Sequence, residues 1–155
     1  MFNMNSLQTR VDEAFIKQNG GRDVHGITNS MAFISSSGSW FPWHPEEMNL
    51  GSANYMHKVA RTVSEFKDVP PGEKVWFFIP KYHAHVFEEA VTRLLHEADV
   101  PIQCANFLMH RYLALDHRIL NKLGIDTYWY CQKEGDLIVT FPYCFHSGMC
   151  NLYNY

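Results

Sequence analysis

Two side chains that could bind a metal stand two residues apart in the triplet His44-Pro45-Glu46. In an extended chain, the side chains at positions i and i+2 point to the same face, so an imidazole and a carboxylate at this spacing can hold one ion together. A second histidine from elsewhere would complete a triad that leaves positions on iron(II) open for a co-substrate and dioxygen. A His-x-Glu triplet is also common by chance in solvated loops, so the triplet needs partners.

Three candidate partners lie further along the chain. His146 ends the segment FPYCFH, and the alternative is a histidine at the rim of an aromatic cluster. Lys74 opens the apolar run KVWFFI, where burial would require an anion such as the distal carboxylate of a dicarboxylic acid. The alternative for Lys74 is a side chain that reaches out to solvent. Asn54 could offer an amide to the same carboxylate.

The elements that must position these residues are mostly β-strands. Residues 74–79 form a short β-branched and aromatic run that Pro80 ends, which is typical of a buried strand. Residues 128–132 and 137–141 are two further strands, and the turn at residues 134–136 between them predicts a hairpin.

A helical insert is expected between these strands. Apolar residues from 86 to 95 recur at helical spacing, with charged residues between them. Asp116 is expected to cap a second short helix that runs through Leu123 and stops at Gly124. The remaining segments are a lead-in over residues 1–25 with a Gly20-Gly21 break, a turn at 35–39, an aromatic patch at 40–43 and a polar surface excursion over 59–72.

The composition favours one folded domain. The chain has 155 residues, of which 46% are hydrophobic and 15% aromatic. A net charge of -3 gives no basic stripe for sequence-specific binding of nucleic acid. No segment has the roughly 18 apolar residues of a membrane span, and no secretory signal begins the chain. The four cysteines are therefore expected to be reduced thiols.

The order and spacing of these pieces resemble one known family. The segments WFPWHPEEMNLGSANYMH, KVWFFIP, EGDLIVTFPYCFHSG and NLYN resemble the successive signature blocks of JmjC domains, in particular those of the JmjN-plus-JmjC histone lysine demethylases that act on di- and trimethyl-lysine. The resemblance implies a mainly β fold with a helical insert, the double-stranded β-helix (jelly-roll, cupin-like). It implies this JmjC core over residues 26–155, incomplete at both ends, after a lead-in segment over residues 1–25.

The resemblance also implies a chemistry. Members of this family are iron(II)- and 2-oxoglutarate-dependent dioxygenases that hydroxylate an N-methyl group, which is then lost as formaldehyde. By position, the resemblance makes His44, Glu46 and His146 the iron ligands. The residues that it implies around them are Lys74 and Asn54 on the 2-oxoglutarate carboxylate, Phe41 and Trp76 as aromatic walls, and Gly26 and Phe33 in the methyl-lysine pocket. Phe33 stands where the family has a tyrosine.

Cys104 and His110 resemble half of a zinc site in the same subgroup. The other half there is a pair of cysteines beyond the catalytic strands. Two ligands do not make a structural zinc site, so zinc is expected here only if another chain completes the set. Otherwise the two residues are a relic of that site, or a core cysteine and histidine.

The implied partner is a methylated histone tail or another basic peptide, and the implied location is the nucleus, with the cytoplasm as the alternative. Three functions stay open: a histone lysine demethylase, a JmjC protein hydroxylase, and a non-catalytic JmjC-like pseudoenzyme that acts as a binding module. A generic metal-binding cupin is a fourth. No segment of this sequence matches the JmjN segment, an upstream tyrosine or the final strands of the family. Residues 59–72 are an extra loop relative to the family. We therefore expect the chain alone to be a poor demethylase.

Overall fold

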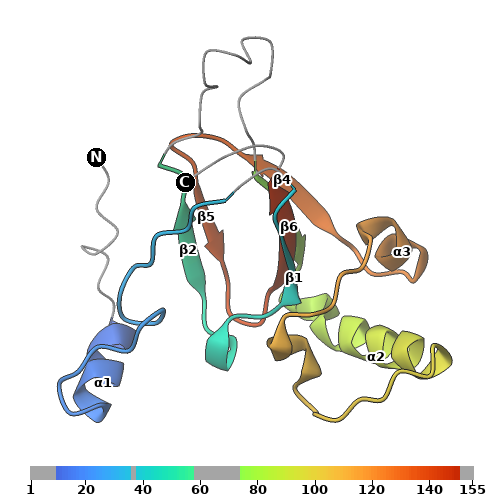
Figure 1. The fold of residues 1–155 in the computed structure, drawn as a ribbon, viewed down its shortest axis with the longest axis horizontal. Coiled ribbons are helices and arrows are strands. Elements are labelled where there is room, and N and C mark those ends of the chain that lie inside the picture. Colours follow the sequence, from blue (N-terminus) through green and yellow to red (C-terminus); the bar gives the residue numbers. More distant parts are fainter. Residues whose placement is uncertain (1–9, 36–37, 58–73, 151–155) are drawn as a thin grey trace.

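The fold consists of two antiparallel β-sheets and a helical layer (Figure 1). The computed structural model describes residues 10–35, 38–57 and 74–150. The predicted excursion over residues 59–72 and the closing NLYN lie outside the described residues. The elements are α1 (Arg10–Gln18), β1 (Trp40–His44), η2 (Glu47–Asn49), β2 (Ser52–Tyr55), β3 (Lys74–Ile79), α2 (Lys81–Glu97), η3 (Phe107–His110), α3 (His117–Lys122), β4 (Tyr128–Gln132), β5 (Leu137–Thr140) and β6 (Phe145–Cys150).

One sheet has four strands in the order β1-β6-β3-β4, and the other pairs β2 with β5. Every pairing between these strands is antiparallel. The two sheets stand opposite each other, and the helices α2 and α3 lie beyond the larger one (Figure 1). This arrangement confirms the predicted fold class, a mainly β core with a helical insert.

The predicted hairpin between residues 128–132 and 137–141 is wrong. Both strands exist, but β4 pairs with β3 whereas β5 pairs with β2. The turn between them carries the chain from one sheet to the other. Its residues bond to the end of β2, since Gly135 N–H donates to the Met56 carbonyl at 2.9 Å and Met56 N–H donates to the Asp136 carbonyl at 3.1 Å. A turn sequence alone does not distinguish a return within one sheet from a crossing between two.

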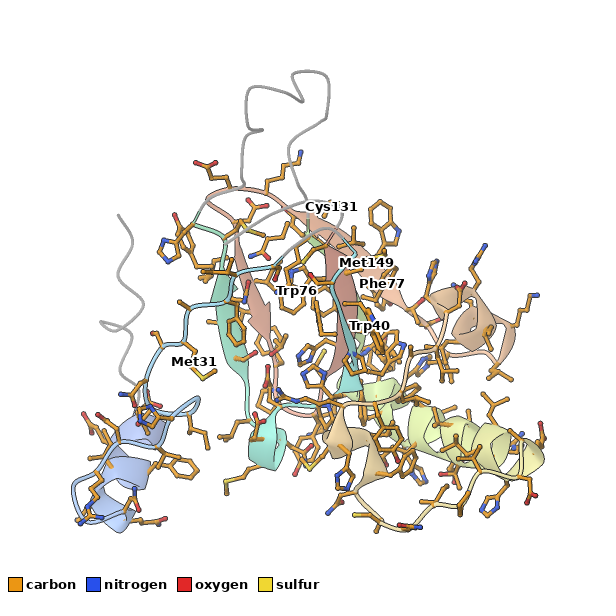
Figure 2. All side chains as sticks on the ribbon, viewed as in Figure 1. Met31, Trp40, Trp76, Phe77, Cys131 and Met149 are labelled. Carbon is orange, nitrogen blue, oxygen red and sulfur yellow. The ribbon has the colours of Figure 1, made fainter. Side chains whose placement is uncertain are left out.

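The two faces of the larger sheet are chemically different because side chains alternate along each strand. Figure 2 places Phe77 on the side of the helices and Trp76 on the side of the smaller sheet. The hydrophobic core lies on the helical side. Its buried members are Trp43, Ile79, Phe87, Val91, Phe107, Leu108, Leu120, Ile125 and Phe145. The buried polar side chains, His44, Gln132, Thr140 and His146, do not belong to this core.

Both predicted helices are confirmed. The amphipathic helix α2 extends beyond the predicted span and buries Phe87 and Val91. Helix α3 begins after Asp116, whose carboxylate accepts the Arg118 N–H at 2.8 Å. Gly124 follows the helix with a φ of 78°, which suits a glycine stop.

The insert between α2 and α3 is fastened to β1 through Trp43. The indole Nε1–H of Trp43 donates to the Leu115 carbonyl at 2.9 Å, and its backbone N–H donates to the Leu113 carbonyl at 3.0 Å.

Among the described residues, no helix is long and apolar enough to cross a membrane. The four cysteines are thiols rather than disulfides.

Candidate metal centre

Strands β1 and β6 bring the two predicted histidines together. They are antiparallel neighbours, and His44 is the register partner of His146. The register shifts between Phe41 and His44, so a local irregularity lets both of these side chains contact His146 on the inner face. Glu46 follows in an extended conformation, with φ -70° and ψ 161°, which returns its carboxylate to the side of His44.

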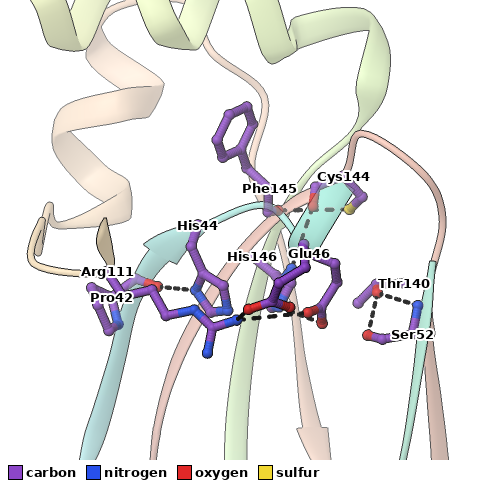
Figure 3. Close-up of polar contacts among 10 residues, drawn as sticks. Pro42, His44, Glu46, Ser52, Arg111, Thr140, Cys144, Phe145 and His146 are labelled. Carbon is purple, nitrogen blue, oxygen red and sulfur yellow. Dashed lines mark hydrogen bonds and ion pairs between the residues drawn. The ribbon is translucent and has the colours of Figure 1, made fainter. Parts of the chain in front are cut away.

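The three side chains converge at the end of β1 (Figure 3). Their ligand atoms all lie within 4.8 Å of one another, close enough to share one ion. Nε2 of His146 is 3.3 Å from Oε1 of Glu46, and the two imidazole centroids are 4.4 Å apart. Both histidines are buried, with 5% and 3% of their surface exposed. Across the described residues, this triad is the group of three or more side chains that could hold a metal.

The outer nitrogens of the two imidazoles bind backbone carbonyls. Nδ1 of His44 lies 2.7 Å from the Pro42 carbonyl oxygen, and Nδ1 of His146 lies 3.3 Å from that of Cys144. A carbonyl oxygen only accepts, so each Nδ1 carries a proton, and Nε2 is the atom of each imidazole that a metal would contact. Such bonds fix the orientation of a metal-binding histidine.

Burial also sets the charge states that a metal requires. Burial, helped by the neighbouring His146, lowers the pKa of His44 from 6.5 to about 4, so the imidazole is neutral at pH 7. Burial by itself would raise the pKa of Glu46, but hydrogen bonds from His146 and Ser52 outweigh it and lower the pKa to about 2. At pH 7 the triad therefore contains a neutral His44 imidazole and a negatively charged Glu46 carboxylate.

Three residues that the sequence did not predict surround Glu46. Ser52 bonds to its carboxylate, and the Ser52 hydroxyl is held 2.6 Å from that of Thr140 on the neighbouring strand. Arg111, at the end of η3, lies 4.0 Å from Oε2 of Glu46 while it pairs with Glu47 (Figure 3). Glu46 is thus contacted from both sheets and from the insert, which restricts its orientation.

Lys74, Trp76 and Phe41 form a wall beside the triad. The Lys74 ammonium lies 4.2 Å from the Trp76 ring centroid and 4.8 Å from that of Phe41. The two ring centroids are 4.9 Å apart, and the Trp76 centroid is 5.9 Å from that of His146. Burial lowers the pKa of Lys74, and among the described residues no carboxylate pairs with it. Within the described chain, the interaction that opposes this effect comes from Cys150, which raises the pKa of Lys74.

Gly148 allows this wall to form. It is the register partner of Phe41 on one side and of Trp76 on the other. A Cβ at this position would lie 2.5 Å from Cζ of Phe41 and would also collide with the Val75 carbonyl oxygen. The Phe41 ring thus occupies space that a side chain at position 148 would need.

The remaining predicted residues, Asn54, Phe33 and Gly26, belong neither to the triad nor to the wall beside it. Asn54 lies on β2, half-buried, with its carbonyl bonded to Gln132. Phe33 is 61% exposed in the segment before β1, and Gly26 adopts a φ of 80° near Met31. Their roles in a substrate pocket stay predictions.

The zinc prediction is equally open. Cys104 precedes η3, His110 is the last residue of η3, and both are exposed. Across the described residues, they do not belong to a group of three potential metal ligands. The two residues remain half of a possible site.

Signals for the missed residues were present but ambiguous. Ser52 and Thr140 stand at the inward-facing positions of β2 and β5, where a hydroxyl is as compatible with a turn or an edge as with a ligand network. Gln132 ends β4 after three aromatic residues and a cysteine, and Gly148 lies in the interior of β6. An interior strand glycine often marks the close approach of another group.

The fold and the triad define a double-stranded β-helix protein with a two-histidine, one-carboxylate centre. Residues 31–155 match the family model described as "JmjC domain, hydroxylase". The chain belongs to this JmjC family.

Curated relatives agree with this assignment. The chain is 29% identical over 134 residues to Lysine-specific demethylase REF6 of Arabidopsis thaliana, covering 86% of the chain and 9% of the relative. It is 30% identical over 133 residues to Lysine-specific demethylase JMJ705 of Oryza sativa subsp. japonica, covering 85% and 9%. It is 29% identical over 154 residues to Probable lysine-specific demethylase 4F of Homo sapiens, covering 99% and 22%. The chain therefore spans between about a tenth and a fifth of the length of these relatives.

Proposed function

We propose that the chain is the catalytic core of an iron(II)- and 2-oxoglutarate-dependent dioxygenase that removes methyl groups from lysine side chains. The observation that carries the proposal is the convergence of His44, Glu46 and His146 at one buried point. The printed names of the relatives, lysine-specific demethylases, support the choice of substrate.

The donor set fits iron(II). Two neutral imidazole nitrogens and one carboxylate oxygen are the ligands of the facial triad that non-haem iron(II) oxygenases use. Three protein ligands leave coordination positions for a co-substrate and dioxygen. When bound, the ion together with 2-oxoglutarate and dioxygen would supply the oxidising power for hydroxylation of a C–H bond.

The residues of the chain itself would bind and orient. His44 and His146 would present Nε2, because their Nδ1 protons are engaged by the Pro42 and Cys144 carbonyls. Glu46 would contribute the negative charge, held by Ser52.

On the co-substrate side, Lys74 would bind the distal carboxylate of 2-oxoglutarate, and Asn54 would assist. An anion there would give the ammonium a charged partner among the aromatic rings that surround it. Phe41 and Trp76 would then wall the carbon chain and keep water away.

We also propose residues 26–155 as the JmjC catalytic unit, with residues 1–25 as a lead-in. The proposed partner is a methylated histone tail or another basic peptide, with Gly26 and Phe33 in the methyl-lysine pocket. The proposed location is the nucleus, where such a substrate lies.

The test is formaldehyde release from a trimethyl-lysine peptide by the iron(II)-loaded chain with 2-oxoglutarate. Because the chain alone is expected to be a poor demethylase, we expect succinate with only a little formaldehyde from the wild-type chain, and neither product from His44→Ala. Succinate with an oxygen atom retained on the peptide would instead support a protein hydroxylase, the description that the family model carries. If the metal-loaded chain forms neither product, the result would support a non-catalytic binding module.

A further inference from the structure

Gln132 is a fully buried polar side chain between the two sheets. It ends β4, has 0% of its surface exposed, and uses both ends of its amide. Oε1 accepts the indole Nε1–H of Trp76 at 2.8 Å. Nε2 donates to the Asn54 carbonyl at 2.9 Å and to the Asp136 carbonyl at 3.2 Å. One side chain therefore joins β3, β4, β2 and the turn before β5.

The direction of this amide is fixed by its partners. Asn54 and Asp136 offer carbonyl oxygens, which only accept, and Trp76 offers an indole N–H, which only donates. A reversed amide would place oxygen against two carbonyls and an NH₂ group against an N–H. Asp136 is itself held in place, since its carboxylate accepts bonds from Tyr130 Oη and Lys133 N–H at 3.0 and 2.8 Å.

Two of the three hydrogen-bond partners of Gln132, Trp76 and Asn54, belong to the proposed co-substrate site. Trp76 is the aromatic wall, and Asn54 is the proposed amide ligand. Lys74 is the register partner of Gln132 across β3 and β4. The network that Gln132 completes thus reaches the Lys74 ammonium through the Trp76 ring.

The orientation of the Trp76 ring matters because the ring lies between Lys74 and His146. Its centroid is 4.2 Å from the Lys74 ammonium and 5.9 Å from the His146 ring. The indole has a single hydrogen-bonding atom, and Gln132 accepts it. Without that bond, the plane of the ring would depend on packing alone.

We propose that Gln132 is a positioning residue for the co-substrate site: it fixes the Trp76 ring and the β2 backbone at Asn54, and so sets the space between Lys74 and the metal centre. This inference rests on the proposed function, because it takes 2-oxoglutarate as the ligand of that space. Gln132 itself touches neither the triad nor the co-substrate in this account.

The test measures binding rather than turnover. Gln132→Met keeps the length and approximate volume of the side chain and removes the amide. The matched control is Gln103→Met, at an exposed glutamine of the insert. 2-Oxoglutarate is titrated calorimetrically into each manganese(II)-loaded chain. We expect Gln132→Met to bind 2-oxoglutarate about tenfold more weakly, as when a buried hydrogen-bond donor loses its acceptor, with manganese(II) affinity unchanged. Gln103→Met should match the wild type.

A spectroscopic readout separates positioning from general loosening of the fold. The chain has four tryptophans, so a ¹⁵N-labelled sample gives four indole N–H signals, and Trp76→Phe identifies the one from Trp76. In Gln132→Met that signal should shift and exchange faster with solvent, while the signal of Trp43, which is bonded to Leu115, should not.

The outcomes distinguish this inference from the function on which it rests. A wild-type chain that binds manganese(II) but not 2-oxoglutarate would end the proposed function, and the inference with it. A wild-type chain that binds 2-oxoglutarate, with equal affinity in Gln132→Met, would overturn the inference alone. If Gln132→Met does not fold, Trp76→Phe tests the same bond while leaving both bonds from Gln132 to the backbone carbonyls. Unchanged 2-oxoglutarate affinity in that variant would also overturn it.

Discussion

Adding one methyl group at Gly148 should displace the wall that Lys74, Trp76 and Phe41 form beside the triad. In Gly148→Ala, the new Cβ would lie 2.5 and 2.7 Å from Cζ and Cε1 of Phe41 and would meet the Val75 carbonyl oxygen. Trp76 and the two histidines lie beside the Phe41 ring, and the Val75 carbonyl belongs to the backbone of a paired strand. Relief therefore requires a shift of strand or ring rather than of a flexible side chain.

The expected cost follows from the size of the overlap. Extra methylene groups in a packed interior cost about 1–3 kcal/mol, and the backbone contact favours the upper part of this range. For a chain of this length, each kcal/mol lowers Tm by about 2–4 °C, so we expect a fall of about 4–12 °C in Gly148→Ala. The affinity for 2-oxoglutarate should also fall, because Phe41 is a proposed wall of its site.

The assay is thermal unfolding of the metal-free chain, followed by calorimetric titration of 2-oxoglutarate into the manganese(II)-loaded chain. The control is Met149→Ala, which changes the next residue of β6, on the opposite face of the strand. A Tm within about 2 °C of the wild type, together with unchanged affinity, would refute the packing argument at Gly148.

Three further predictions concern the triad and its neighbour. His44→Ala or His146→Ala should lower the iron(II) content of the purified chain by a large factor, whereas His85→Ala, on an exposed helix face, should not; equal iron content in all three would count against the triad. Lys74→Ala should weaken 2-oxoglutarate binding about tenfold to a hundredfold, because a charge-assisted hydrogen bond contributes about 1.5–3 kcal/mol, and iron(II) should still bind; equal affinity would make Lys74 a structural residue only. The pKa of His44 falls from 6.5 to about 4 on folding, so the unfolded metal-free chain takes up a proton first as the pH falls. Its free energy of unfolding should therefore drop by about 3 kcal/mol between pH 6.5 and pH 4. Urea titrations should give a shallower pH dependence in His44→Gln, and the same slope in both proteins would contradict the buried neutral imidazole.

Much of the fold follows from local patterns in the sequence. The apolar run at residues 74–79 is β3, and the helical spacing from 86 to 95 lies within α2. Asp116 caps its helix as expected. These elements are set by side-chain periodicity and short-range bonding, which a single sequence contains.

Other features depend on contacts between distant segments. Residues 128–132 and 137–141 carry a turn signal typical of a hairpin, yet they join different sheets because their partners lie elsewhere in the chain. The register shift between Phe41 and His44 changes which side chains face inward, and no local pattern indicates it.

The triad can be predicted from the sequence, whereas the hydrogen bonds that hold the residues around it cannot. His44 and Glu46 stand two residues apart, and His146 ends a recognisable segment. The bonds from Gln132 to Trp76 and Asn54 cross 56 and 78 residues of sequence, so they become visible only once the sheets are assembled.

The central claim is that a metal held by His44, Glu46 and His146 activates 2-oxoglutarate, and succinate formation tests it most directly. The purified chain is loaded with iron(II) and supplied with 2-oxoglutarate and oxygen, without any peptide. We predict that succinate forms with the wild-type chain and with His85→Ala, and that it falls to the level of free iron(II) in His146→Ala. Succinate formation that is absent from the wild type, or equal in His146→Ala, would contradict the claim.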